Sequence, residues 1–179
     1  MRDHTRPYAP DANATEPEDR PLVGALVVYA PIRLAAPDLD PRLGYVLPLY
    51  LDDAILLGRK KSPMVNVPGE DRTVHVSAHL LFPDTGTFLQ ISREHMLVEV
   101  LADARTRVVD MSASGHFAAR KGEYVGGAGS PTSTSYEGRE SIYLACPRLR
   151  QDTSPSALAA SNSHCVQLVR FDGSGELRS

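Results

Sequence analysis

The feature that most constrains this chain is a succession of short apolar runs rich in β-branched residues, each ended by turn-forming residues. At these lengths the composition favours strands over helices. Short strands separated by turn signals predict an all-β fold, a twisted β-sandwich of about 10–11 strands. The predicted strands lie within residues 22–32, 45–57, 65–67, 74–82, 96–101, 106–111, 117–125, 140–146 and 164–171.

The composition is that of an ordinary globular protein. Apolar residues make up 42% of the 179 residues and charged residues 23%, whereas disordered chains have fewer apolar residues and more net charge. A chain of this length forms one domain more readily than two. We therefore predict a single domain over residues 21–172. A disordered tail, residues 1–20, precedes it, and a polar tail, residues 173–179, follows it.

Charge and hydropathy exclude several classes of partner. The formal net charge of −3 argues against direct nucleic-acid binding, which needs a basic face. No apolar run approaches the roughly twenty residues that cross a bilayer. The first twenty residues are polar and acidic, unlike a signal peptide. We therefore predict an intracellular protein that makes no membrane contact.

The sequence also predicts a protein without metal or cofactor. Cys146 and Cys165 lie in apolar stretches and form no metal-binding pair, so we expect reduced thiols in the core. His75 and His79 would share one face of a strand, but no cysteine or carboxylate accompanies them at metal-site spacing. The glycines of residues 122–127 lack the strand–turn–helix context of a dinucleotide loop.

Three short polar motifs stand where predicted strands meet loops. Gly58-Arg59 ends one apolar run, residues 92–95 (Ser-Arg-Glu-His) open another, and residues 110–115 (Asp-Met-Ser-Ala-Ser-Gly) close a third. Pairing of the strand after the second motif with the strand before the third brings these two motifs to one end of the sheet. Loops at the ends of rigid strands present binding groups without disturbing the core. We therefore predict a small anion-binding surface there.

The connections between the strands give further expectations. Residues 45–57 predict a hairpin, divided at Asp52-Asp53, whose second strand delivers Gly58-Arg59. Residues 126–138 are rich in glycine, serine and threonine and predict a surface loop. Residues 151–162 predict either a loop or one short helix that begins at Ser154-Pro155.

The order of the motifs, Gly-Arg, then Ser-Arg-x-His, then Asp-x-Ser-x-x-Gly, resembles the forkhead-associated domain, a family that reads phosphothreonine peptides. The resemblance implies a phosphopeptide-binding module, not an enzyme, that recruits a phosphorylated protein partner in a nuclear or signalling assembly. It implies a nuclear location and the following phosphopeptide contacts: Arg59, Ser92, Arg93 and Ser114. It further implies loop-supporting roles for Gly58, His95 and Gly115, and auxiliary roles for Lys60, Lys61 and His116.

These residue types suit the ligand. A phosphothreonine carries nearly two negative charges and three acceptor oxygens, so its reader needs guanidinium, hydroxyl or amide donors on rigid supports. The third motif departs from the family pattern, Asp-x-Ser-x-Asn-Gly-Thr, because Ser114 replaces the asparagine and His116 the threonine. A serine has one donor where the amide has two donors and an acceptor. We expect altered contacts to the peptide backbone, partly compensated by a charged His116 beside the phosphate.

The connection between the first and second motifs is longer than the family usually has, which predicts an inserted hairpin. Residues 74–82 alternate polar and apolar side chains and predict one strand with a solvated face. The turn at residues 83–86 should then lie near the site and contribute to its selectivity. We also expect that a short linker in place of residues 71–86 would preserve folding.

Two other functions fit the same residues. In the first, the altered third motif has lost phosphate binding, and a scaffold of the same fold mediates phosphorylation-independent protein interaction or oligomerisation. The second is a hydrolase, which would need Ser92, His95 and Asp110 to align as nucleophile, base and orienting carboxylate. A structural histidine explains the same three residues, and no Gly-x-Ser-x-Gly motif is present.

Overall fold

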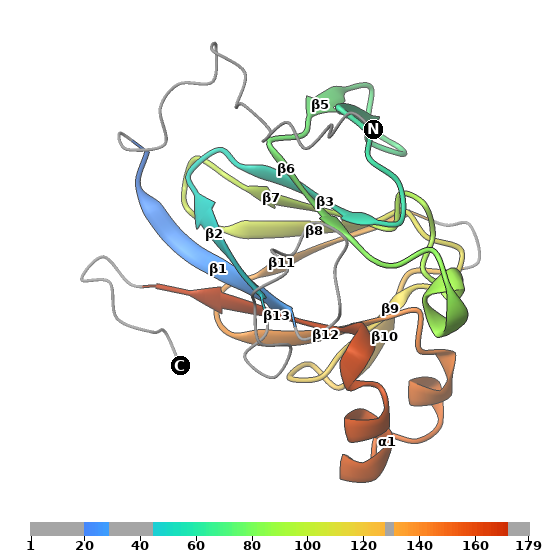
Figure 1. Ribbon diagram of the computed structural model, residues 1–179. Helices are drawn as coiled ribbons and strands as arrows, with labels where there is room; N and C mark the ends of the chain where they lie inside the picture. Colours follow the sequence, from blue (N-terminus) through green and yellow to red (C-terminus); the bar gives the residue numbers. More distant parts are fainter. Residues whose placement is uncertain (1–19, 29–44, 128–130, 172–179) are drawn as a thin grey trace, which may run out of the picture.

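The computed structural model of this protein describes residues 20–28, 45–127 and 131–171. These residues form thirteen strands, which build two facing sheets and one separate hairpin (Figure 1). The all-β sandwich predicted from the sequence is confirmed, with more strands than expected. Most of the predicted N-terminal tail, residues 29–32 of the first predicted strand, and the predicted C-terminal tail lie outside the described residues.

The two sheets differ in their strand order. The six-stranded sheet consists, in spatial order, of β10 (Glu123–Val125), β9 (His116–Ala118), β12 (Glu140–Leu144), β13 (Cys165–Arg170), β1 (Leu22–Val28) and β2 (Tyr45–Tyr50). The five-stranded sheet consists of β11 (Thr132–Tyr136), β8 (Thr106–Asp110), β7 (Met96–Val100), β3 (Ala54–Gly58) and β6 (Ala78–Leu81). Among the strand pairs of the described residues, only β3 and β6 run parallel.

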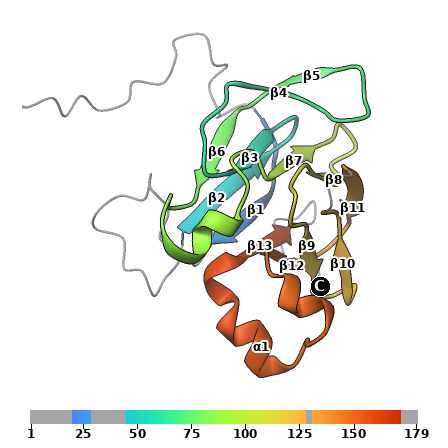
Figure 2. The same cartoon turned by 90° about the vertical axis from the view of Figure 1, so that its right-hand side faces the viewer.

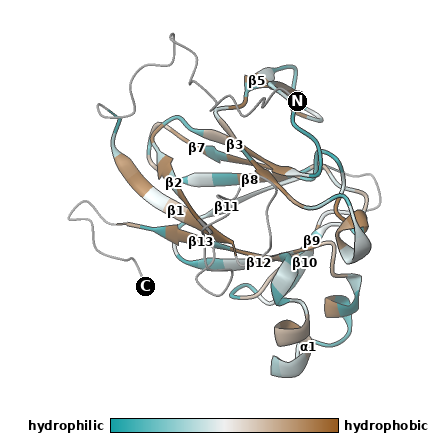
Figure 3. Ribbon diagram, viewed as in Figure 1, coloured by the Kyte–Doolittle hydropathy of each residue, from teal (hydrophilic) through white to brown (hydrophobic). Residues whose placement is uncertain are grey.

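Alternation along the strands directs one set of side chains into the space between the sheets. The main core combines residues of both sheets, such as Leu26 of β1 and Val98 of β7, which are almost fully buried. Strands β1 and β13 are largely apolar (Figure 3), in agreement with this position. Every predicted core residue is buried: Leu56, Leu97, Val98, Val100, Val108, Val109 and Leu144.

The five-stranded sheet is also covered on its outer face, by the hairpin of β4 (Met64–Asn66) and β5 (Thr73–His75). Val67, which follows β4, packs with Leu97 and Val109 in a second apolar cluster. This cover explains why all five residues of β3 and of β7 are buried. The hairpin lies at the opposite pole of the molecule from helix α1 (Pro155–Ala160) (Figure 2).

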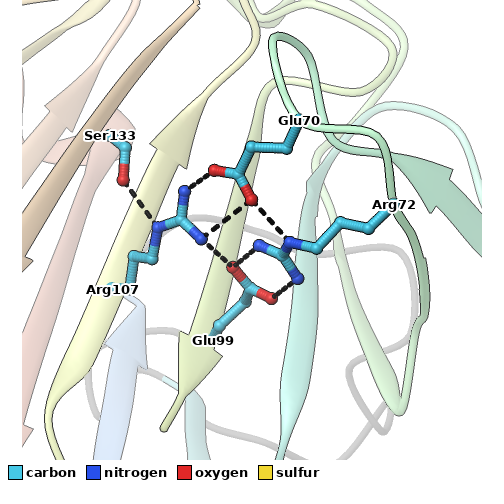
Figure 4. A network of polar contacts seen from close by, with 5 residues as sticks. All are labelled: Glu70, Arg72, Glu99, Arg107 and Ser133. Atoms are coloured by element: carbon cyan, nitrogen blue, oxygen red, sulfur yellow. Dashed lines mark hydrogen bonds and ion pairs between the residues drawn. The ribbon is translucent and has the colours of Figure 1, made fainter.

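A charged network fastens the hairpin to the sheet (Figure 4). Arg72 of the hairpin forms a bidentate pair with Glu99 of β7, at 2.7 and 2.8 Å. Glu70 pairs with Arg107 of β8, which also donates a 2.6 Å hydrogen bond to Ser133 of β11. Bidentate guanidinium–carboxylate pairs fix orientation as well as distance. The network therefore holds the hairpin in one orientation across three strands.

The prediction of a hairpin over residues 45–57 is wrong. Strand β2 pairs with β1 in the six-stranded sheet, whereas β3 pairs with β7 and β6 in the other. Between them Asp52 has φ 65°, a left-handed conformation that turns the chain from one sheet to the other. Leu49 and Ile55 thereby enter the same core cluster from opposite sheets. A hairpin within one sheet would not bring them together in this way.

The prediction of one continuous strand over residues 74–82 is also wrong. Strand β5 belongs to the covering hairpin, whereas β6 adds to the edge of the five-stranded sheet. Leu80 and Phe82 are fully buried. Replacing residues 71–86 by a linker would therefore remove core side chains, so the expectation that folding would survive is not supported. The hairpin in this part of the chain is formed by β4 and β5 instead.

Two of the remaining connections contain regular structure, an edge strand and a short helix. Residues 132–136, predicted as part of a loop, form edge strand β11 against β8. Residues 155–160 form the short helix α1, which Ser154 caps by accepting a hydrogen bond from the amide of Ala157. The other helices of the described residues are short 3₁₀ turns: η2 (Gly86–Gln90), η3 (Pro147–Arg150) and η4 (Asn162–His164). Cys146 and Cys165 are buried free thiols, as predicted. Among the described residues, no helix has the length and apolarity to span a bilayer.

Candidate functional site

Three strand ends of the five-stranded sheet meet at one end of the sandwich. Met96 at the start of β7 pairs with Leu57 near the end of β3 on one side and with Asp110 at the end of β8 on the other. The three motifs lie directly beyond these residues. We call the connecting segments the first loop (residues 59–63), the second loop (residues 91–95) and the third loop (residues 111–115). Antiparallel pairing therefore brings the three loops together.

Backbone hydrogen bonds join the first loop to the second. The amides of Arg59 and Lys60 both donate to the carbonyl oxygen of Arg93, at 3.0 Å. A side chain at Gly58 would prevent this approach, because its Cβ would lie 2.1 Å from the same oxygen. The glycine of the first motif is thus required by a close approach of two backbones.

The side chain of Arg59 is fixed at the rim of these loops. Its Nε donates a 2.5 Å hydrogen bond to the carbonyl oxygen of Ile91, and Nη1 forms an ion pair with Asp84. Only 17% of the side chain is exposed. Because its Nε is held by backbone, the guanidinium has a defined place beside the second loop. The cation is therefore positioned before any ligand arrives.

The other predicted cations lie more openly around Arg59. Lys60, Lys61 and Arg93 are exposed. The half-buried Ser92 makes no side-chain hydrogen bond to any other described residue, so its hydroxyl is able to donate to a ligand. The acidic residue of the second loop, Glu94, is engaged by the hydroxyl of Ser62. The first and second loops therefore present mainly positive charge.

His95 connects the second loop to the third from the buried side of the two loops. Its Nδ1 accepts a 3.0 Å hydrogen bond from the amide of Ser92, so Nε2 carries the proton and donates to the carbonyl oxygen of Gly115, 3.2 Å away. Burial lowers the pKa of His95 to about 4, despite the opposing effect of Asp110. The imidazole is therefore neutral near pH 7 and serves as a fixed link between two loops.

The third loop is organised around the buried carboxylate of Asp110. Its Oδ1 accepts hydrogen bonds from the amide and the hydroxyl of Ser112, at 2.9 and 2.7 Å. The Ser112 hydroxyl in turn accepts one from the amide of Gly115. Burial alone would raise the pKa of Asp110, but hydrogen bonds from His116 and Ser112 hold it below its usual value. An ionised carboxylate thus shapes the turn that ends at Gly115.

The expectation that His116 assists phosphate binding needs correction. Its side chain is buried, with Nδ1 2.6 Å from Asp110 Oδ2 and Nε2 3.2 Å from the hydroxyl of Tyr136. As the first residue of β9, His116 directs its ring under the third loop rather than toward solvent. The expectation followed from the position of His116 in the third motif and from the stabilisation of a charged histidine beside a phosphate, but the carboxylate of Asp110 binds this histidine inside the core.

Ser114 occupies the outer side of the third loop. Its hydroxyl donates to the carbonyl oxygen of Gln90, 3.2 Å away, and its own carbonyl accepts a 2.7 Å hydrogen bond from the hydroxyl of Tyr124. The guanidinium of Arg150 lies 4.2 Å above the ring of Tyr124. The sequence predicted a role in the site for neither Tyr124 nor Arg150. No motif marks them, since they approach the third loop only through β10 and η3.

The geometry does not assemble Ser92, His95 and Asp110 into a hydrolytic triad. His95 accepts from the backbone amide of Ser92 rather than from its hydroxyl, and Asp110 binds His116 instead of orienting His95. A triad requires the base to bond the nucleophile and the carboxylate to bond the base. The described residues also hold no group of three metal-ligating side chains.

Comparison with known proteins gives structural similarity alone. No protein-family model matches the chain, and no curated protein matches it. Forkhead-associated domains of solved structure are similar to it. The domain of the CT664 protein from Chlamydia trachomatis shares 13% identity over 84% of this chain and 99% of its own, with a TM-score of 0.44. The N-terminal domain of Rad53p from S. cerevisiae, solved with a phosphothreonine peptide, shares 13% identity over 86% and 95%, with a TM-score of 0.42. An engineered domain solved with a Myc-pTBD peptide shares 14% identity over 84% and 92%, also with a TM-score of 0.42.

Proposed function

We propose that this protein is a binding module for phosphothreonine-containing peptides, with Arg59 and Ser92 as the principal phosphate contacts. The observation that carries the proposal is the junction of the first two loops. The amides of Arg59 and Lys60 donate to one carbonyl of the second loop, and the guanidinium of Arg59 donates to the carbonyl of Ile91, the residue before Ser92. A guanidinium and a hydroxyl on rigid supports suit the charge and the acceptors of a phosphate monoester.

The surrounding residues support an anionic ligand. Arg93, Lys60 and Lys61 add exposed positive charge, and His95 holds the loops without itself being charged. Because His95 is neutral and buried, the charge that attracts the phosphate comes from Arg59 and the exposed cations around it. In this proposal Gly58 and Gly115 keep the loop backbones close, and Ser114 meets the peptide beyond the phosphothreonine.

The partner we propose is a phosphorylated protein of a nuclear or signalling assembly, and this part rests on the resemblance of the motifs. A phosphorylation-independent scaffold is the competing function. One observation favours the scaffold: the hydroxyl of Ser114, the residue that replaces the amide of the family pattern, already donates to the carbonyl of Gln90. The two functions differ in whether binding depends on the phosphate.

The test compares an oriented library of phosphothreonine peptides with the same library unphosphorylated. Calorimetric titration of the selected peptide in both forms then measures the phosphate dependence. We expect binding only, or at least tenfold more tightly, to the phosphorylated form, since a charged hydrogen bond contributes about 1.5–3 kcal/mol. Equal affinity for both forms would reject the phosphothreonine reader and leave the scaffold.

A further inference from the structure

The guanidinium of Arg59 already has a carboxylate partner in the free protein. Nη1 of Arg59 forms an ion pair with Oδ1 of Asp84. The two side chains differ in exposure, with 17% of Arg59 and 58% of Asp84 accessible to solvent. The arginine is thus the fixed member of the pair, and the aspartate approaches it from the solvent side.

The parallel pair β3–β6 explains why Asp84 reaches this place. Gly58 lies opposite Leu81, and the amide of Phe82 donates a 2.9 Å hydrogen bond to the carbonyl of Gly58. Parallel neighbours end at the same edge of a sheet, so the residues after β6 emerge beside the residues after β3. The turn of residues 83–86 therefore begins next to the first loop.

A carboxylate and a phosphate use the same donors of a guanidinium. The phosphate carries more charge and one more acceptor oxygen, so it is the stronger ligand for Arg59. An ion pair with one exposed partner is weak, which allows a phosphate to displace it. Because the Nε of Arg59 is held by the carbonyl of Ile91, a phosphate that binds in a bidentate way needs Nη1 and Nη2 together, and it therefore competes with Asp84 for Nη1.

We propose that Asp84 is an internal substitute for the phosphate of the ligand. Its carboxylate occupies Arg59 in the free protein, and the turn of residues 83–86 moves aside when a phosphothreonine binds. The inference rests on the proposed function and adds a regulatory contact to it. The turn lowers affinity for every phosphorylated ligand by the same factor, and it excludes weakly acidic peptides that cannot displace Asp84.

The direct test uses inorganic phosphate, so that it does not depend on the choice of peptide. Phosphate is titrated into the 15N-labelled protein, and the Nε–H signal of Arg59 is followed by NMR, with Arg59→Ala identifying the signal. We expect Asp84→Asn to reach half-response at about two- to fivefold lower phosphate concentration, the range set by exposed ion pairs. Asp103→Asn is the matched control, because Asp103 pairs with Arg105 on the β7–β8 connection, at the other end of the sheet.

An unchanged or weaker response in Asp84→Asn would overturn the inference, since Asp84 would then merely hold Arg59 in position. The selected phosphothreonine peptide provides the second arm. A peptide that binds the unmodified protein but binds Asp84→Asn no more tightly rejects the internal substitute and keeps the proposed function. In the opposite outcome, Arg59 of Asp84→Asn responds at a lower phosphate concentration, but the protein binds phosphorylated and plain peptides equally. That result rejects the proposed function and supports the competition between Asp84 and phosphate for Arg59.

Discussion

His95 donates a hydrogen bond from Nε2 to the carbonyl oxygen of Gly115, 3.2 Å away, and thereby ties the second loop to the third. The same ring accepts from the amide of Ser92 and has no exposed surface. The relative position of two of the three loops therefore depends on one neutral side chain, and this dependence gives the first two predictions.

His95→Ala should lower the free energy of unfolding by about 2–5 kcal/mol, because it leaves a cavity and two buried backbone groups without partners. Urea denaturation followed by circular dichroism measures the loss. His75→Ala is the control: His75 is exposed on β5, and its replacement should change stability by less than about 0.5 kcal/mol. Equal losses in the two variants would show that the link contributes nothing.

The protein should lose stability as the pH falls from 6.5 toward 4. The pKa of His95 is about 4 in the folded protein and 6.5 when unfolded, so in this window the unfolded state binds more protons. Stability is complete above pH 6.5 and falls by up to about 1.4 kcal/mol per pH unit from this group. His79 and His164, whose pKa values burial also lowers, add to the slope.

The contribution of His95 is isolated by comparing the unmodified protein with His95→Gln between pH 7 and pH 4.5. Both proteins keep His79 and His164, so the variant should show the shallower dependence. Parallel slopes would mean that His95 does not titrate as the geometry requires.

Arg59→Ala should weaken phosphopeptide binding by roughly ten- to a hundredfold, the value of one charged hydrogen bond. Ser92→Ala should weaken it less, because a hydroxyl supplies one neutral donor. Arg105→Ala removes an exposed arginine at the opposite end of the sheet and should leave affinity unchanged. Calorimetry with the selected peptide measures all three. A similar loss in Arg105→Ala would indicate a general charge effect rather than a site.

Gly58→Ala should both destabilise the fold and weaken binding. The added Cβ would lie 2.1 Å from the carbonyl oxygen of Arg93, so the first two loops must separate. Overpacking of this kind costs about 1–3 kcal/mol. Thermal unfolding measures the first effect, and peptide titration below the transition measures the second. Full stability would show that the loop backbones are able to separate without cost.

Ser114→Asn should tighten phosphopeptide binding by about two- to tenfold, because the amide adds donors worth about 0.5–1.5 kcal/mol to the outer side of the third loop. Ser156→Asn on the exposed face of α1 is the control for the substitution itself. No change in either variant would place the bound peptide away from the third loop. Competition against a fluorescent phosphopeptide has the sensitivity to separate these results.

The sequence by itself determined the strand content and the loops that carry the motifs. Alternating β-branched runs identified the core residues, because burial of one face follows from side-chain direction along a strand. Sequence order also brought the second and third motifs together, because β7 and β8 are consecutive and antiparallel. The loop-supporting role of His95 was implied by the resemblance of the motifs to the family pattern, not by local periodicity.

Only the tertiary structure decided which strands share a sheet. Asp52 sends β2 and β3 to opposite sheets, although their adjacency in sequence favours a hairpin. It also decided which polar side chains face solvent: His116 turns inward to Asp110, and Asp84 turns toward Arg59. Short-range patterns record the preferences of a segment. Pairing between distant segments depends on which apolar faces and charges the rest of the chain supplies, and that information is not local.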